Sequence, residues 1–142
     1  MATLNPVVFY CFSADLAHGL HDFSSDTLKL ALTNTAPTQA SDDAFADISE
    51  ISAGDGYTAG GETVTVSSSS QTAGTYSLIT SGTVEWESTG TIGAFRYIPL
   101  YNDDATNDEL ISYYDIGSSV TLYNGDKYTL DTAITLITYN FS

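Results

Sequence analysis

The 142-residue sequence contains a single cysteine, Cys11, and this scarcity excludes two kinds of cross-link. A lone cysteine forms no intramolecular disulfide and no metal site built from several thiolates. A reactive thiolate would also need a neighbouring cation, and the sequence has very few. Cys11 lies in the apolar run from Phe9 to Phe12, so we expect it to act as a small buried apolar side chain.

Basic residues are scarce as well. The sequence has three Lys and Arg residues in total but 18 Asp and Glu residues, and the formal net charge is −15. Such a chain repels nucleic-acid phosphates and anionic membranes, and it has too few cations to form a basic patch. The sequence therefore predicts no nucleic-acid partner and no membrane partner. The acidic surface is explained either by solubility or by a need to avoid nucleic acid.

Helical periodicity is absent beyond residue 23, and short apolar or alternating segments take its place. Such segments, separated by turn residues at regular spacing, are typical of β-sandwiches. We expect strands at residues 27–33, 62–66, 75–79, 83–87, 94–101, 110–114, 120–123, 126–130 and 132–141. The sequence predicts an all-β fold, a single-domain antiparallel β-sandwich, with a jelly roll as the expected topology.

Turn residues predict how these strands are connected. The glycine-rich segment 53–61 predicts turns with positive φ angles. The serine run 67–71 predicts an exposed loop, and residues 102–108 predict a polar hairpin loop. Asn124-Gly125 predicts a two-residue type I′ hairpin between the strands on either side. Pro99 indicates a bulge or an edge position in the most apolar strand.

The first 26 residues differ from the rest, so we divide the chain into an N-terminal segment, 1–26, and a sandwich domain, 27–142. The N-terminal segment allows two interpretations, a short helix near 14–20 or an extended arm from 4 to 12. An arm could lie across a neighbouring subunit or add a strand to its sheet. The candidate assembly contacts are its apolar residues Leu4, Val7, Phe9, Tyr10 and Phe12.

Two groups of residues could bind metal ions. His18 and His21 would share one face of a helix, but zinc needs three or four well-placed ligands, so surface or interface histidines are the favoured interpretation. The acidic loop 103–109 carries oxygen ligands without the spacing of a calcium loop, so a solvated hairpin is favoured over weak calcium binding. We expect no metal and no cofactor.

Catalytic patterns are weak. Glu85 and Glu87 share one face of a strand, as the carboxylate pairs of glycosidases can, but alternation with Val84 and Trp86 places them toward solvent. The sequence has no Gly-x-Ser-x-Gly motif. We therefore expect a non-enzymatic protein without catalytic residues. The ten tyrosines indicate interface contacts, cross-strand pairs within the sandwich, or both.

Four stretches form a recognisable set: residues 27–37, 46–61, 95–103 and 114–122. Taken together, they resemble a family of small virion structural proteins of tailed bacteriophages. The most specific part is Gly-Tyr-Thr-Ala-Gly-Gly at 56–61. The resemblance covers residues 27–131, and the N-terminal segment carries little of it.

The resemblance implies a structural role in the phage particle. The best-fitting role is a capsid cement or decoration protein, which binds the outside of the head and stabilises the shell. Its localisation would be the capsid surface of the virion, after synthesis in the host cytoplasm. Its partners would be the major capsid protein and copies of itself, as a dimer or trimer. A tail, baseplate or fibre-associated protein, with possible glycan binding, is the alternative.

Overall fold

The computed structural model describes residues 4–80, 82–131 and 135–140. Its elements, in chain order, are β1 (Val7–Val8), α1 (Cys11–Ala17), β2 (Leu28–Leu30), η1 (Phe45–Asp47), β3 (Glu62–Val64), β4 (Val66–Thr72), β5 (Thr75–Thr80), β6 (Thr83–Glu87), β7 (Thr91–Asn102), β8 (Leu110–Tyr123), β9 (Lys127–Asp131) and β10 (Thr135–Asn140). Strands dominate the described residues, and α1 and the 3-10 turn η1 are short. The prediction of an all-β fold is confirmed.

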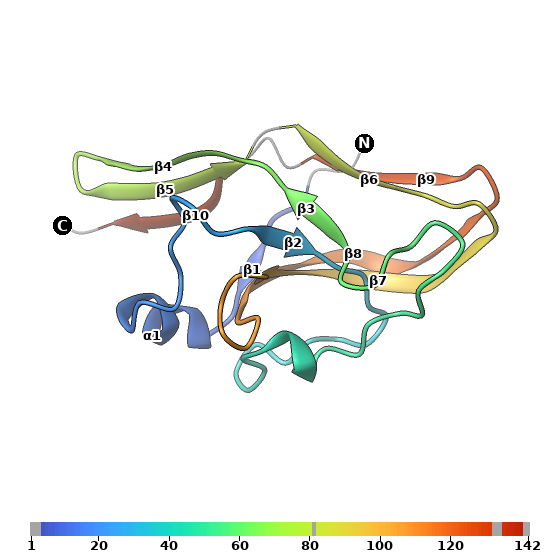
Figure 1. Cartoon of the computed structure of the whole chain (residues 1–142), viewed down its shortest axis with the longest axis horizontal. Coiled ribbons are helices and arrows are strands. Elements are labelled where there is room, and N and C mark those ends of the chain that lie inside the picture. The colour runs from blue at the N-terminus through green and yellow to red at the C-terminus, as the bar shows by residue number, and fades with distance from the viewer. Residues whose placement is uncertain (1–3, 81, 132–134, 141–142) are drawn as a thin grey trace.

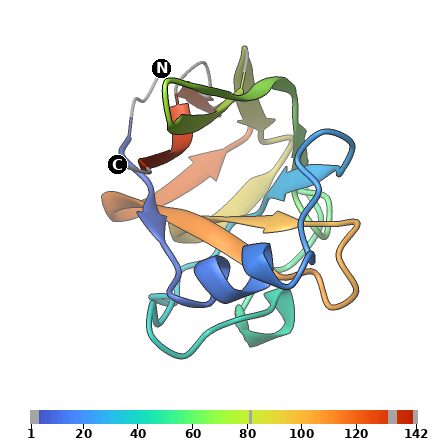
Figure 2. The ribbon, with the colours of Figure 1, turned by 90° about the vertical axis from the view of Figure 1, so that its left-hand side faces the viewer.

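The strands form three antiparallel sheets. Their orders are β1-β8-β7-β2-β3, β10-β5-β4 and β6-β9. In Figure 1 the five-stranded sheet forms one layer, and the two smaller sheets lie across it at opposite ends of the molecule. Figure 2 shows α1 and η1 on the other side of the five-stranded sheet. The predicted antiparallel sandwich is confirmed, whereas this strand order does not confirm a jelly roll.

Four strands form one long two-stranded ribbon that folds over between the layers. β7 pairs with β8, and β6 pairs with β9 in the same antiparallel sense. At the fold, the Ser88 amide donates to the Asp126 carbonyl (2.9 Å), and the Gly125 amide donates to the Ser88 carbonyl (2.8 Å). This bend carries β6 and β9 from one layer into the other, as the right-hand side of Figure 1 shows.

The hairpin predicted at Asn124-Gly125 does not form, because the strands on either side of it pair with other strands of the ribbon. Asn124-Gly125 joins β8 to β9, which pair with β7 and β6 and not with each other. Gly125 has a φ of 88°, but Asn124 is not among the residues with positive φ. A type I′ turn needs positive φ at both central residues, so this turn lacks the geometry that would bring the strands back together.

The serine run is also different from its prediction. Residues 66–72 form strand β4, which pairs with β5 through a two-residue turn at Ala73-Gly74. Both turn residues have positive φ, 52° and 83°, which is the type I′ combination. The loop prediction rested on side-chain polarity, and it was wrong because an exposed edge strand can be polar on both faces.

Apolar residues lie on both faces of the five-stranded sheet. The inner cluster combines buried side chains from all three sheets, including Leu30, Val64, Leu78, Trp86, Phe95, Tyr114 and Leu130. The outer cluster contains Phe9, Ala31, Tyr101 and Leu110, with Phe45 stacked on Tyr101 at a centroid distance of 4.2 Å. The central strands β2, β7 and β8 are therefore covered on both sides, and the expected half-buried pattern at 27–33 understates their burial.

Pro99 lies within the central strand β7, so its predicted edge position is wrong. The Pro99 carbonyl accepts a hydrogen bond from the Ala31 amide (3.1 Å), one residue beyond the end of β2. Its nitrogen faces the same side and has no hydrogen to donate to Ala31, so the ladder is interrupted there and resumes at the bridge between Thr33 and Tyr97. A register shift between Leu100 and Tyr101 provides the bulge that was the other expectation.

Candidate functional site

The glycine-rich segment, which carries the most specific part of the resemblance, ties three parts of the fold together. The Tyr57 hydroxyl donates to Glu50 Oε2 (2.7 Å) and accepts the Leu32 amide (3.0 Å). The Gly60 amide donates to the same carboxylate oxygen (2.6 Å), and the Tyr101 hydroxyl donates to the Gly60 carbonyl (2.6 Å). We refer to Glu50, Tyr57, Gly60 and Tyr101 as the Glu50 network. It fixes the loop to the sheet.

The glycines of this segment have positive φ, as predicted, and two of them also make close backbone contacts. Gly56 has a φ of 102°, and a Cβ there would overlap the Glu87 carbonyl oxygen. Gly61 has a φ of 85°, and a Cβ there would overlap the Leu30 carbonyl oxygen. Only glycine satisfies both constraints without displacing β2 or β6. The positive φ values and close contacts of these glycines explain their place in the motif by folding.

The N-terminal segment is integrated into the sandwich. β1 pairs with β8 at the edge of the five-stranded sheet, and the Gln39 side chain donates to the Val8 carbonyl (2.7 Å). The Phe9 amide donates to the Ile111 carbonyl (3.0 Å). The segment thus occupies a strand position within its own fold. The helix interpretation also has a counterpart in α1, which begins at Cys11 and ends at Ala17, earlier than expected.

The five predicted assembly contacts have unequal exposure. Phe9 and Phe12 are 1 % and 0 % exposed, so their side chains belong to the protein's own cores. Leu4 is partly buried and packs against the inner cluster, and Val7 is also partly buried. Tyr10 is 64 % exposed. Their role in assembly stays a prediction, and among these side chains Tyr10 is the most accessible to a partner.

The two histidines do not share a helical face, because α1 ends before His18 and Gly19 takes a φ of 76°. His18 is exposed, whereas His21 is buried and packs in a cluster with Phe12 and Phe23, whose ring centroids are 5.4 and 5.3 Å from its own. The side-chain amide of Asn102 lies 3.0 Å from His21 Nδ1. Burial lowers the pKa of His21, so this histidine is neutral near pH 7 and serves as a packing residue.

An acidic cavity of about 560 Å³ lies beside η1. Its lining includes Asp15, Asp43, Asp108 and Glu109, so the loop 103–109 contributes to it as well. A hydrogen bond with Asp47 raises the pKa of Asp43, and burial raises the pKa of Asp108. Across the described residues, no group of three or more His, Cys, Asp or Glu side chains is arranged to hold a metal ion.

Glu85 and Glu87 lie on the solvent face of β6, as their alternation with buried Val84 and Trp86 predicted. Both carboxylates approach Lys127 on β9, at 3.6 and 3.7 Å. The Thr129 hydroxyl donates to Glu85 (3.1 Å). This arrangement is a cross-strand ion pair on an open surface.

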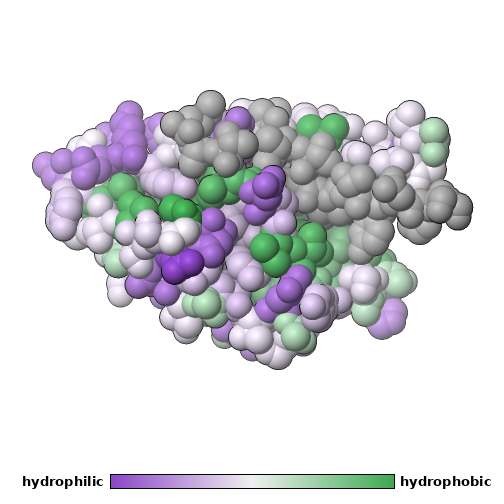
Figure 3. Space-filling model, turned by 180° about the vertical axis from the view of Figure 1, so that it is seen from behind, coloured by the Kyte–Doolittle hydropathy of each residue, from purple (hydrophilic) through white to green (hydrophobic). Residues whose placement is uncertain are grey.

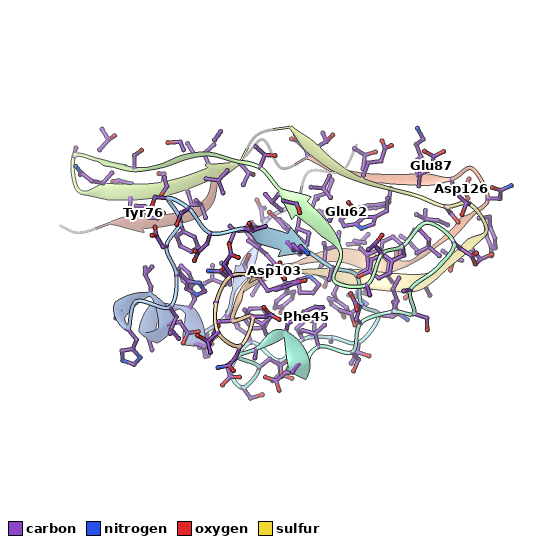
Figure 4. All side chains as sticks on the ribbon, viewed as in Figure 1. Phe45, Glu62, Tyr76, Glu87, Asp103 and Asp126 are labelled. Atoms are coloured by element: carbon purple, nitrogen blue, oxygen red, sulfur yellow. The ribbon has the colours of Figure 1, made fainter. Side chains whose placement is uncertain are left out.

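The sheet β10-β5-β4 differs from the other two sheets of the described chain in its charge. Its strands contain no Asp, Glu, Lys or Arg. We call it the neutral sheet. Residues 63–84 form the longest charge-free stretch of the sequence, and this signal could have revealed the surface before the structure. The hairpin β4–β5 projects at one end of the molecule (Figure 1). In Figure 4, Tyr76 marks this end, and Glu87 and Asp126 lie at the opposite end.

Figure 3 shows the same contrast on the surface. Strongly hydrophilic residues lie at the end formed by the fold of the ribbon and over the middle of this face, whereas the coloured atoms at the tip of the hairpin end are pale. Beneath the hairpin lies a groove of about 360 Å³, whose lining includes Leu16, Phe23, Ser24, Ser69 and Tyr76. The Ser69 and Tyr76 hydroxyls are hydrogen-bonded to each other at 2.9 Å.

No family model matches the sequence, and no curated protein or solved structure matches it at a significant level. Within the described residues, no helix is long and apolar enough to cross a membrane.

Proposed function

We propose that the protein is a non-enzymatic structural component of a bacteriophage particle, a capsid cement protein that binds the outside of the head. The observation that carries the proposal is the separation of charge. A body with a net charge of −15 presents one projecting sheet without any charged residue. Protein contacts are favoured at the neutral sheet, where no charge must be desolvated, and the acidic body is repelled by packaged DNA.

The rigidity of the fold supports the same role. Cement binds the assembled shell and not its free subunits, so it stabilises the shell by mass action. Such a clamp must transmit force without opening. The Glu50 network and the two apolar clusters hold the loop 50–61, the central sheet and the N-terminal segment in one unit.

The test uses particles that lack the protein. Purified protein is added, and bound copies are counted by sedimentation and gel densitometry, followed by heat and osmotic-shock challenge. Saturation at a copy number that matches the whole shell, with increased resistance to shock, supports cement. Absence of binding to heads contradicts the proposal. Removal of residues 1–12 tests the N-terminal segment separately, although loss of Phe9 and Phe12 from the cores requires a circular-dichroism check of folding.

A tail, baseplate or fibre-associated role with glycan binding is the second candidate, and the groove beneath the hairpin favours it. Aromatic rings beside hydroxyl groups, as in Phe23, Tyr76, Ser24 and Ser69, suit the apolar faces and hydroxyls of sugars. Binding of a few copies to tails alone, together with calorimetric binding of a host polysaccharide that Tyr76→Ala abolishes, would support this role. Trp86 fluorescence would not report such binding, because Trp86 is 1 % exposed and lies on β6.

A further inference from the structure

We propose that two copies of this protein associate through antiparallel pairing of their β4 strands, which joins the two neutral sheets into one continuous sheet. This inference goes beyond the cement role and does not depend on it. It rests on three features of β4: its free edge, its lack of charge and the geometry of its hairpin.

The first feature is the edge. β4 pairs with β5 on one side, and among the described residues no backbone hydrogen bond reaches residues 67–72 from any other strand. A free edge displays unpaired amide and carbonyl groups to any second strand. Natural proteins protect such edges with charged residues, proline or bulges. β4 has one register shift, near Val66, and nothing of this kind from Ser68 to Thr72.

The second feature, the lack of charge, indicates which partner pairs with the free edge of β4. Two copies with a net charge of −15 each repel one another across most of their surfaces. The neutral sheet is where two copies can approach without bringing carboxylates together. A basic partner would instead be attracted to the acidic body and would gain nothing from the neutral edge. The charge distribution therefore favours a second copy of the same chain.

The third feature limits the register, and we place the two-fold axis at Ser70, midway between two edge-facing residues. The two-residue turn at Ala73-Gly74 makes Thr72 and Thr75 a hydrogen-bonded pair, so alternation directs the amides and carbonyls of Ser69 and Gln71 to the free edge. A two-fold axis at Ser70 then pairs Ser69 of each copy with Gln71 of the other. Such a two-fold contact is closed, which limits the assembly to a dimer.

The dimer should be weak, because serine side chains bury little apolar surface at this edge. Sedimentation equilibrium of the purified chain should show a mass that rises from the 15.1 kDa monomer toward the dimer with concentration. High salt should strengthen association because it screens the repulsion between the acidic bodies. A monomer at millimolar concentration in high salt overturns the proposal.

Charge variants at the axis test the location. Ser70→Lys and Ser70→Glu each place two like charges opposite one another, and each should weaken association roughly fivefold. An equimolar mixture should restore it through heterodimers. Ser41→Lys, on an exposed loop, changes the net charge as Ser70→Lys does and should leave association intact or stronger. If Ser70→Lys behaves like Ser41→Lys, β4 is not the contact.

A cross-linking pair tests the register. In a Cys11→Ala background, Ser70→Cys places two thiols in a non-hydrogen-bonded pair with Cα atoms about 4.5 Å apart, which suits a disulfide. Ser68→Cys is the matched control, because its two copies would lie roughly 13 Å apart along the strands. Rapid dimeric cross-linking of Ser70→Cys alone supports the proposal. Equal cross-linking of both variants, or of neither, overturns this register.

These outcomes are separable from those of the cement proposal. A dimer in solution that does not bind heads overturns the cement role and leaves the β4 contact standing. A monomer in solution whose shell occupancy falls with Ser70→Lys overturns the second copy as occupant and identifies a capsid strand at this edge.

Discussion

The Tyr57 hydroxyl donates a hydrogen bond to Glu50 Oε2 at 2.7 Å while it accepts the Leu32 amide at 3.0 Å. Tyr57 is 3 % exposed and Leu32 is 0 % exposed, so the Leu32 amide has no water as a substitute for this hydroxyl. This single hydroxyl therefore connects the loop at 50–61 to β2 and its continuation. It is the most direct point at which to test whether the glycine-rich motif serves folding.

Tyr57→Phe should lower the free energy of unfolding by about 1–3 kcal/mol, the usual cost of leaving a buried donor without a partner. Urea denaturation followed by circular dichroism measures the change. Tyr10→Phe is the control, because Tyr10 is 64 % exposed and its change should stay within about 0.5 kcal/mol. Equal losses in the two variants would show that the Glu50 network contributes nothing specific.

Three glycine-to-alanine changes separate backbone strain from close contact. Gly61→Ala combines positive φ with overlap on the Leu30 carbonyl and should cost more than about 3 kcal/mol. Gly19→Ala has positive φ and open space, so only strain of about 1–2 kcal/mol is expected. Gly93→Ala, in β7, has open space and no positive φ, and it should be neutral or slightly stabilising. Thermal denaturation gives the order, and a cost at Gly61 no greater than that at Gly19 would contradict the contact.

Sequence reasoning succeeded where local pattern and final environment agree. Alternation in β6 correctly placed Val84 and Trp86 inside and the two glutamates outside, because the strand has one buried face. It failed at Asn124-Gly125, since strong turn chemistry does not reveal which distant strand competes for pairing. The two segments expected at 110–114 and 120–123 belong to one strand, β8, which pairs with β7 at 110–115 and again at 120–123, whereas residues 116–119 between them have no partner on β7.

Exposed surfaces were harder to predict than the core. The serine run in β4 carries no apolar pattern, and its strand conformation depends on backbone pairing with β5. The apolar residues 4–12 suggested an arm, yet the outer cluster and β8 bury much of that segment. An apolar sequence predicts burial but does not say whether the burying partner is the same chain or a neighbour. The charge-free stretch 63–84 is visible in the sequence, but only the structure places β4 and β5 beside the equally uncharged β10 in one sheet.

His21 should make stability depend on pH. Its pKa is lowered first by burial, against the opposing effects of Asp15, Glu109 and Asp26. Because the folded pKa is below the ordinary value of 6.5, the unfolded chain binds more protons, so stability is complete above 6.5 and is lost as pH falls toward the folded pKa. His21→Gln should flatten this part of the stability profile, measured by urea denaturation at several pH values.

The matched control for this pH effect is His18→Gln, at an exposed position. Its free energy of unfolding should depend on pH as steeply as that of the native protein. The pKa values of Asp43 and Asp108 are raised in the folded protein, so these two groups make stability rise as the pH falls, at more acidic pH. The two histidine variants should therefore be compared in the pH range around the ordinary histidine pKa. A slope that persists in His21→Gln would assign the effect to another group.

Cys11 should be unreactive in the folded protein although it is only partly buried. Burial, reinforced by Asp15, raises its pKa to about 12, so very little thiolate exists at pH 8. The Cys11 thiol also lies 3.7 Å from the Leu110 carbonyl, which holds it against β8. Reaction with a disulfide reagent at pH 8 should therefore be many times slower in buffer than in concentrated urea. Rapid modification of the native protein would show that the α1–β8 contact opens readily and that the N-terminal segment can leave the sandwich.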